Sequence, residues 1–187
     1  MKDQVNFERA EAAGDFLGQS GKEDNAVRAE TPEEAVVRIL KERGLLLTTA
    51  ESCTGGMVAS RIVNVPGASD VFHAGFITYC DKAKRKMLGV SKKTLKKYTA
   101  VSAATAAEMA EGAAKRAKAD IAVSVTGIAG PDGGTEKFPV GLVFLCCSMS
   151  GKTEVEELHL NGGRAEIRAQ AAELALDLVR KTILRGE

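Results

Sequence analysis

Short apolar segments alternate with helical segments along most of this chain, and this alternation constrains the fold more than any other feature. The apolar, β-rich segments cover about residues 45–49, 71–79, 121–125 and 140–148, and a more polar strand follows at 154–160. Alternation of this kind is typical of α/β proteins, in which helices cover the faces of a largely parallel sheet. The sequence therefore predicts an α/β sandwich.

Capping residues and terminal glycines delimit the helices between these strands. Thr31-Pro32-Glu33-Glu34 combines an N-cap, a proline at the first helical position and a capping-box acid, and Gly44 ends that helix. Asp81 is the expected N-cap of a helix that reaches Leu88. The other predicted helices are 57–63, a basic helix capped by Ser91 and reaching Tyr98, a long helix capped by Ser102 and reaching Ala117, and about 164–184.

The link between the last two strands shows that the sheet is not entirely parallel. Ser150-Gly151 is too short to contain the crossover helix that a parallel connection needs. At least one antiparallel pair must therefore be present. We expect a mixed, mostly parallel sheet.

Length and charge limit the organisation of the chain and its partners. The chain has 187 residues, which favours one domain, over 31–187, after a charged extension at 1–30 that we expect to be flexible or partly helical. The net charge of +1 and the 4% aromatic content without Trp argue against a nucleic-acid-binding protein. We find no apolar segment long enough to cross a membrane and no signal peptide. We expect a cytoplasmic protein.

Two segments rich in small residues follow buried strands and are the predicted ligand-binding loops. They are 49–56, which contains Thr54, Gly55 and Gly56, and 125–134, which contains Thr126 with further glycines. Small residues let backbone N–H groups approach a ligand closely, and ligands of open α/β sheets bind at the carboxyl ends of strands. Each loop alone is equally compatible with a tight turn. Together they favour a nucleotide or phosphate site.

Ser52 is the candidate nucleophile, because it lies at a predicted strand-to-helix turn. The N–H groups that follow it, up to Gly55 and Gly56, are expected to stabilise an oxyanion. From its position alone, a serine that serves only as a helix cap is the simpler interpretation. Cys53 is a rival nucleophile, although a buried, unreactive thiol is the simpler interpretation.

The base that a serine nucleophile requires is harder to identify. Neither His73 nor His159 lies in a loop with acidic partners. Lys84 would occupy the first turn of its helix, where the helix dipole and neighbouring cations disfavour its charge. To act near neutrality its pKa must fall from ~10.4 at a free-energy cost of ~4 kcal/mol, and partial burial would have to supply much of that. From spacing alone, a surface lysine is the simpler interpretation.

Two arginines near the start of the last predicted helix are further candidates for ligand binding. Arg164 opens the last helix after Asn161-Gly162-Gly163, and Arg168 follows one turn later. A guanidinium beside glycines suits a carboxylate or a phosphate, although a solvated helix face has the same spacing. No His, Asp, Glu or Cys cluster has metal-ligand spacing, so we expect no metal and no cofactor.

Several of these segments together resemble the CinA C-terminal domain family over about Thr31 to Leu184. The matching segments occur in the same order and are 49–56, 75–79, Lys84, 100–102, 125–134, Lys137, 139–141, Arg164 and 167–168. One segment differs from the family pattern. The usual Tyr-Ser-Asn-Glu-Ala-Lys is replaced by Tyr79-Cys80-Asp81-Lys82-Ala83-Lys84.

The resemblance implies a PncC-type nicotinamide mononucleotide deamidase, which hydrolyses the substrate carboxamide to nicotinic acid mononucleotide and ammonia. It also implies a three-layer α/β/α fold with a mixed sheet, and a homo-oligomer. By resemblance, Ser52 is the nucleophile, Lys84 the general base and Tyr79 a supporting hydroxyl. Our alternative is a catalytically inactive nucleotide-binding regulatory module, which the altered residues Cys80, Asp81 and Lys82 favour. The expected substrate-binding residues are Thr54, Gly55, Gly56, Ser102, Thr126, Gly127, Gly130 and Arg164.

Overall fold

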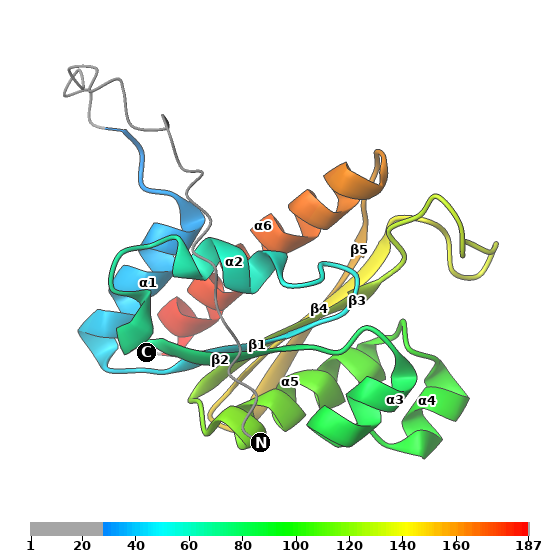
Figure 1. The fold of residues 1–187 in the computed structure, drawn as a ribbon, viewed down its shortest axis with the longest axis horizontal. Coiled ribbons are helices and arrows are strands. Elements are labelled where there is room, and N and C mark those ends of the chain that lie inside the picture. The colour runs from blue at the N-terminus through cyan, green and yellow to red at the C-terminus, as the bar shows by residue number, and fades with distance from the viewer. Residues whose placement is uncertain (1–27, 187) are drawn as a thin grey trace, which may run out of the picture.

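The computed structural model describes residues 28–186, which fold into one sheet with helices on both of its faces (Figure 1). Most of the extension expected over 1–30 lies outside the described residues. The strands are β1 (Leu47–Glu51), β2 (Phe72–Ile77), β3 (Ile121–Gly127), β4 (Leu142–Met149) and β5 (Lys152–His159). The helices are α1 (Pro32–Arg43), α2 (Met57–Val63), η1 (Ala68–Asp70), α3 (Asp81–Ala83), η2 (Lys84–Leu88), α4 (Lys92–Tyr98), α5 (Ala103–Ala117) and α6 (Arg164–Arg185).

The five strands are arranged in the order β2-β1-β3-β4-β5. β1 pairs in parallel with both β2 and β3, whereas β3–β4 and β4–β5 are antiparallel. The predicted mixed sheet is confirmed, but the expectation that it is mostly parallel is too strong. Because β4 lies between β3 and β5 and runs against both, the neighbouring pairs divide evenly between the two types.

The core has two parts, one on each face of the sheet. On one face, α1, α2 and α6 pack through residues such as Leu40, Ile62 and Leu176, all of them fully buried. On the other face, α5 packs through Met109 and small alanines, beside α3 and α4. The predicted three-layer α/β/α arrangement is confirmed.

Side-chain caps begin three of the helices, as the sequence predicts. Thr31 forms a capping box with Glu34 at the start of α1, and Ser91 and Ser102 accept from backbone N–H groups at the starts of α4 and α5. The expected cap at Asp81 is wrong. Cys80 occupies the N-cap position of α3 and makes no side-chain capping bond, and Asp81 is the first helical residue.

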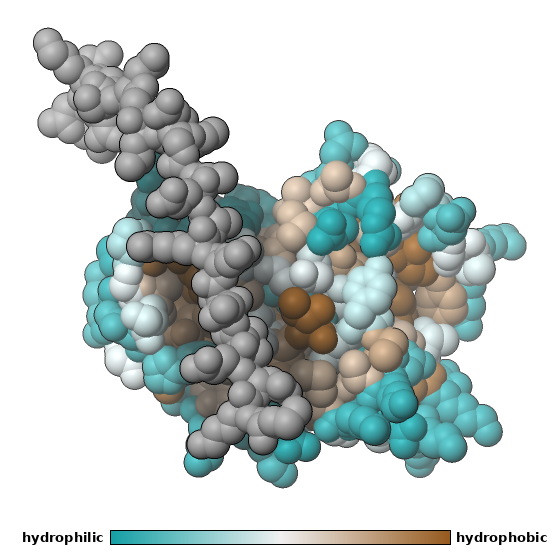
Figure 2. Space-filling view, in the orientation of Figure 1, coloured by the Kyte–Doolittle hydropathy of each residue, from teal (hydrophilic) through white to brown (hydrophobic). Residues whose placement is uncertain are grey.

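The edge strand β2 is only half buried, with side chains that alternate between partly buried and exposed. Figure 2 shows apolar surface in the middle of this face of the molecule, over the carboxyl end of β2. Ile77 and Tyr79 are among the exposed large side chains there. Within residues 28–186, no helix is long and apolar enough to cross a membrane.

Parallel pairing determines where a ligand can bind. The carboxyl ends of β2, β1 and β3 meet at the same edge of the sheet, because these neighbours run in one direction. The backbone N–H of Ser52, just after β1, donates to Val125 O at 2.9 Å. The loop after β1 is thereby attached to β3, beside the loop that follows β3.

Candidate active site

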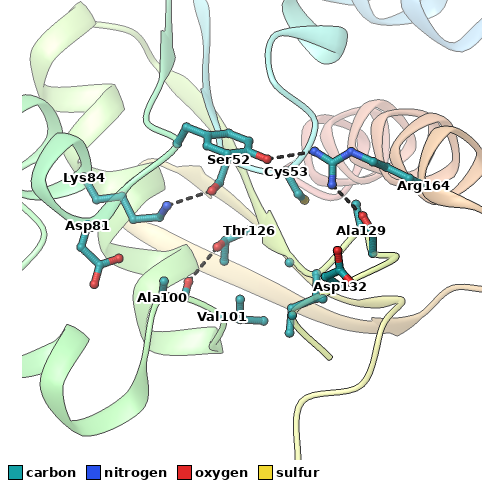
Figure 3. Close-up of a pocket in the computed structure, with 15 residues that line it drawn as sticks. Ser52, Cys53, Asp81, Lys84, Ala100, Val101, Thr126, Ala129, Asp132 and Arg164 are labelled. Atoms are coloured by element: carbon teal, nitrogen blue, oxygen red, sulfur yellow. Dashed lines mark hydrogen bonds between the residues drawn. The ribbon is translucent and has the colours of Figure 1, made fainter. Parts of the chain in front are cut away.

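A cavity of about 260 Å³ lies at this edge of the sheet (Figure 3). Its walls come from the segments that follow β1, β2 and β3, from the segment before α5 and from the start of α6. The lining residues are Ser52, Cys53, Tyr79, Asp81, Lys84, Ala100, Val101, Thr126, Gly127, Ile128, Ala129, Gly130, Asp132, Gly133 and Arg164. Segments far apart in the sequence therefore form one small enclosure.

Ser52 and Lys84 face each other in this cavity (Figure 3). The Nζ atom of Lys84 lies 2.8 Å from Ser52 Oγ and also donates to Thr78 O at 2.8 Å. The carbonyl of Thr78 fixes the direction of the amine, so one side of the nitrogen is turned towards the serine hydroxyl. This is the contact that a nucleophile and its base require.

Burial determines the charge that Lys84 can carry. Its side chain is only 1% exposed, and this burial lowers the pKa of the amine below its usual value of 10.5, against the opposing effect of Asp81. Lys84 begins η2, a single π-helical turn that directly continues α3. Lys84 is thus not the surface lysine that its spacing favours, because the chain directs it into the cavity.

A buried carboxylate holds the loop that carries Ser52. Glu51, the last residue of β1, accepts from the backbone N–H groups of Gly56, Val58 and Ala59 at 2.8, 3.2 and 2.9 Å. These are the groups that the first turn of α2 leaves without helical partners. Glu51 therefore fixes α2 relative to β1, and with it the intervening turn.

Only some of the N–H groups expected to stabilise an oxyanion are available for that role. The N–H of Gly55 donates to Ser52 O at 3.1 Å, and the N–H of Gly56 donates to Glu51, so both are engaged. The N–H groups of Cys53 and Thr54 have no oxygen acceptor within the described part of the chain. These two groups, immediately after Ser52, are the donors that remain for an oxyanion.

Arg164 connects two walls of the cavity. Its guanidinium donates to Tyr79 Oη at 2.9 Å and to Gly130 O at 2.8 Å (Figure 3). Tyr79 is 60% exposed, and Arg164 is exposed as well, so the pair lies at the mouth. The positive charge is therefore available to an anionic group of a ligand at the entrance.

The end of β3 and the loop after it form the opposite wall. Thr126 donates its hydroxyl to Ala100 O at 2.7 Å, which attaches this wall to the segment before α5. A Cβ atom at Gly127 would lie 2.7 Å from Leu142 O, so only glycine fits there. Gly130 lies in the left-handed region with φ +74°, where glycine is also favoured.

Four of the residues expected to bind substrate do not line the cavity. Thr54 is fully buried, and its hydroxyl oxygen has no hydrogen-bond partner among residues 28–186. Gly55 and Gly56 shape the turn after Ser52 through positive φ angles. Ser102 caps α5 through a bond from the N–H of Thr105.

Two acidic residues of the cavity wall were not predicted as site residues. Asp81 was expected to cap a helix, but it lines the cavity and acts on the charge of Lys84. Asp132 belongs to the glycine-rich segment after β3, which is the signal that could have identified it. Within the described range, no group of three or more His, Cys, Asp or Glu side chains could hold a metal ion.

Comparison with known proteins identifies a family that this chain resembles in sequence. The family described as "CinA C-terminal domain" matches residues 29–183. A "CinA-like protein" from Kosmotoga olearia is 56% identical over 158 residues, which are 84% of this chain and 38% of that protein. The chain spans about two fifths of the length of the curated relatives that it matches.

Solved structures of similar proteins have the same fold as this chain. A competence-damaged protein (CinA) superfamily protein from Klebsiella pneumoniae superposes with a TM-score of 0.80 at 35% identity, covering 82% of this chain and 96% of that one. The competence/damage inducible protein CihA from Agrobacterium tumefaciens gives a TM-score of 0.77 at 42% identity, covering 84% and 98%. The chain therefore belongs to the family of the CinA C-terminal domain.

Proposed function

We propose that this chain is an amidohydrolase that converts nicotinamide mononucleotide to nicotinic acid mononucleotide and ammonia. The observation that carries the proposal is the 2.8 Å contact between Lys84 Nζ and Ser52 Oγ inside the cavity. A buried amine with a lowered pKa is a competent base for a serine hydroxyl. The family resemblance supplies the choice of substrate.

Acylation begins when Ser52 Oγ attacks the carboxamide carbon while Lys84 Nζ takes the hydroxyl proton. The carbonyl oxygen becomes an oxyanion, and the N–H groups of Cys53 and Thr54 stabilise it. Collapse of the intermediate breaks the C–N bond. The protonated Lys84 returns its proton to the leaving nitrogen, which departs as ammonia and leaves an acyl ester on Ser52.

Deacylation repeats the same steps with water as the nucleophile. Lys84 takes a proton from the water as its oxygen attacks the ester carbon, and then protonates Ser52 Oγ as the C–O bond breaks. The product is the free carboxylic acid. One base therefore serves both halves of the reaction.

The shape and charge of the cavity support a nucleotide substrate. Its volume of about 260 Å³ is near the lower end of small-molecule sites. The glycine-rich wall at 126–133 lets a ligand approach the backbone, and the Arg164 guanidinium at the mouth suits a phosphate. The reactive amide then lies near Ser52, and the phosphate lies near solvent.

Ammonia release from purified protein supplied with nicotinamide mononucleotide tests the proposal. We expect turnover by the wild type, and Ser52→Ala should reduce it by at least ~10⁴-fold. Lys84→Ala should have nearly the same effect. Lys82→Ala is the matched control, because that side chain is exposed and does not line the cavity, and it should retain most activity.

Two results would contradict the proposal. The first is wild-type protein that binds the nucleotide in calorimetry without releasing ammonia, which would favour the inactive nucleotide-binding module. The second is full activity in Ser52→Ala.

We also propose that the protein works as a cytoplasmic homo-oligomer. The resemblance to the family supports the oligomer. Light scattering of the purified chain would measure its mass, and a monomer at micromolar concentration would contradict this part of the proposal.

A further inference from the structure

Arg168 contacts the loop that carries the nucleophile, although it does not line the cavity. From the first turns of α6, its Nε donates to Cys53 O at 3.0 Å and its NH2 group donates to Thr54 O at 2.8 Å. The side chain is half buried between α6 and the loop. A charged guanidinium therefore binds two consecutive carbonyl groups directly after Ser52.

A hydrogen bond that holds the carbonyl oxygen of a peptide group also fixes the direction of the N–H in the same peptide group. A trans peptide is planar, and its N–H points away from its C=O. The carbonyl of Cys53 is held by Arg168, which directs the N–H of Thr54 to the opposite side. The carbonyl of Ser52 is held by the N–H of Gly55, which does the same for the N–H of Cys53.

The N–H groups of Cys53 and Thr54 are directed to one side chain, that of Cys53. Both act on the sulfur of Cys53, where they favour the thiolate and oppose the effect of burial on its pKa. That side chain lines the cavity beside Ser52. Both donors are thus directed to the part of the cavity wall next to Ser52.

We propose that Arg168 is a positioning residue, which holds the Cys53–Thr54 peptide so that its N–H can stabilise the oxyanion formed at Ser52. This inference rests on the proposed function. Arg168 makes no hydrogen bond to Ser52 or Lys84; its hydrogen bonds go to the backbone, and its charge also acts on the neighbouring Cys53 side chain. Its contribution grows as charge develops in the transition state, because oriented donors stabilise an oxyanion more strongly than a neutral carbonyl.

The geometry explains why arginine and glycine occur together here. A planar guanidinium presents several N–H donors in a rigid fork, whereas the single amine of lysine cannot reproduce two parallel bonds. A Cβ atom on Gly55 would lie 3.3 Å from the NH2 group of Arg168, and the φ of Gly55 is +62°. A side chain at position 55 would therefore crowd Arg168 and take a backbone conformation that glycine favours.

Steady-state kinetics on Arg168→Gln and Arg168→Lys test this role. We expect kcat for ammonia release to fall between ~10- and ~100-fold, less than the ~10²–10³ that loss of an oxyanion donor costs. KM should change by less than about threefold, since ground-state binding is kept. The matched control is Arg180→Gln on the same helix, whose side chain pairs with Asp177 away from the site. It should keep the wild-type kcat.

Chemical rescue separates positioning from a general loss of structure. In Arg168→Ala, added guanidinium at millimolar concentration should restore part of kcat, and sodium at the same concentration should not. An Arg168→Ala protein that is folded by circular dichroism and whose lost kcat guanidinium does not restore would contradict the proposal. If Arg168→Ala does not fold, Arg168→Lys provides the test through its kcat and KM.

A fluorophosphonate probe makes the test independent of the nicotinamide substrate. Ser52 Oγ attacks phosphorus, a P–O bond forms, the P–F bond breaks with loss of fluoride, and the serine proton passes to Lys84. Mass spectrometry then measures the rate at which Ser52 is labelled. We expect Arg168→Gln to be labelled at least about tenfold more slowly than wild type and Arg180→Gln.

Slow labelling of Arg168→Gln, combined with no ammonia from the wild type, would support the positioning role and refute the proposed substrate. Equal labelling of wild type and Arg168→Gln would overturn the positioning role, whatever the substrate.

Discussion

At the residue scale, burial acts on two neighbours of the cavity with opposite consequences for their reactivity. Burial disfavours the charged form of any group. It lowers the pKa of the Lys84 amine, which makes the neutral, basic form more available. It raises the pKa of the Cys53 thiol to about 11, which keeps the sulfur protonated and a poor nucleophile. The same desolvation therefore favours a serine–lysine pair over a thiol enzyme.

Replacing Cys53 tests this contrast. We expect Cys53→Ser to retain ammonia release within about threefold of wild type, because the thiol is protonated at neutral pH and takes no part in proton transfer. Initial rates with nicotinamide mononucleotide measure the effect, and alkylation of the wild type by iodoacetamide should be slow at Cys53. Activity lost in Cys53→Ser but kept in Ser52→Ala would identify a thiol enzyme instead.

The sequence could identify the candidate dyad residues but not their environment. Ser52 is recognisable from its place after a strand, and the family resemblance points to Lys84. The burial of Lys84 depends on a π-helical turn and on a carbonyl, Thr78 O, that no local pattern indicates. The sequence also could not show which of the N–H groups after Ser52 stay available for an oxyanion, because the partners of Gly55 and Gly56 are set by the folded turn.

At the element scale, the junction between β1 and α2 depends on a single carboxylate. Glu51 is 1% exposed and accepts three N–H groups from the start of α2. A negative charge also suits the positive end of the helix. The turn with Ser52 is held between these two elements, so the position of Ser52 follows from this contact.

We expect Glu51→Gln to lower the free energy of unfolding by about 1–3 kcal/mol. The amide nitrogen of glutamine is itself a donor and would face a backbone N–H of α2. At least one of these two donors would then be buried without an acceptor. Urea denaturation measures the loss. The control is Glu42→Gln, at an exposed pair with Arg38, which should change stability by less than about 0.5 kcal/mol. Equal stabilities of Glu51→Gln and wild type would contradict the account of the junction.

The starts of helices could be predicted where a capping residue in the sequence marks them. The Thr31, Ser91 and Ser102 caps are local, and the helices that they begin are found close to the expected positions. The segment after β2 was predicted less well, as one helix capped by Asp81. There the chain forms α3 and then the wider turn of η2, which brings Lys84 inward, so tertiary packing decided the geometry.

At the scale of the whole molecule, the order of the strands creates the site. β1 is an interior strand with parallel neighbours on both sides, so the segments after β2 and β1 and the end of β3 supply Tyr79, Ser52 and Thr126 to one cavity. The alternation of strands and helices predicts an α/β sandwich, but strand order depends on pairings between distant segments. The antiparallel β3–β4 pair, whose connection is the glycine-rich loop, was for this reason not foreseen.

The protonation of Lys84 tests the central claim most directly. Nitrogen-15 NMR can follow the Nζ signal of Lys84 as pH is raised, with Lys84→Met identifying the resonance. Because burial penalises the cation, the folded protein should release this proton at a pH below 10.5, and kcat/KM should rise with pH through the same midpoint. A Lys84 amine that stays protonated up to pH 10.5 or beyond would contradict its role as the base for Ser52.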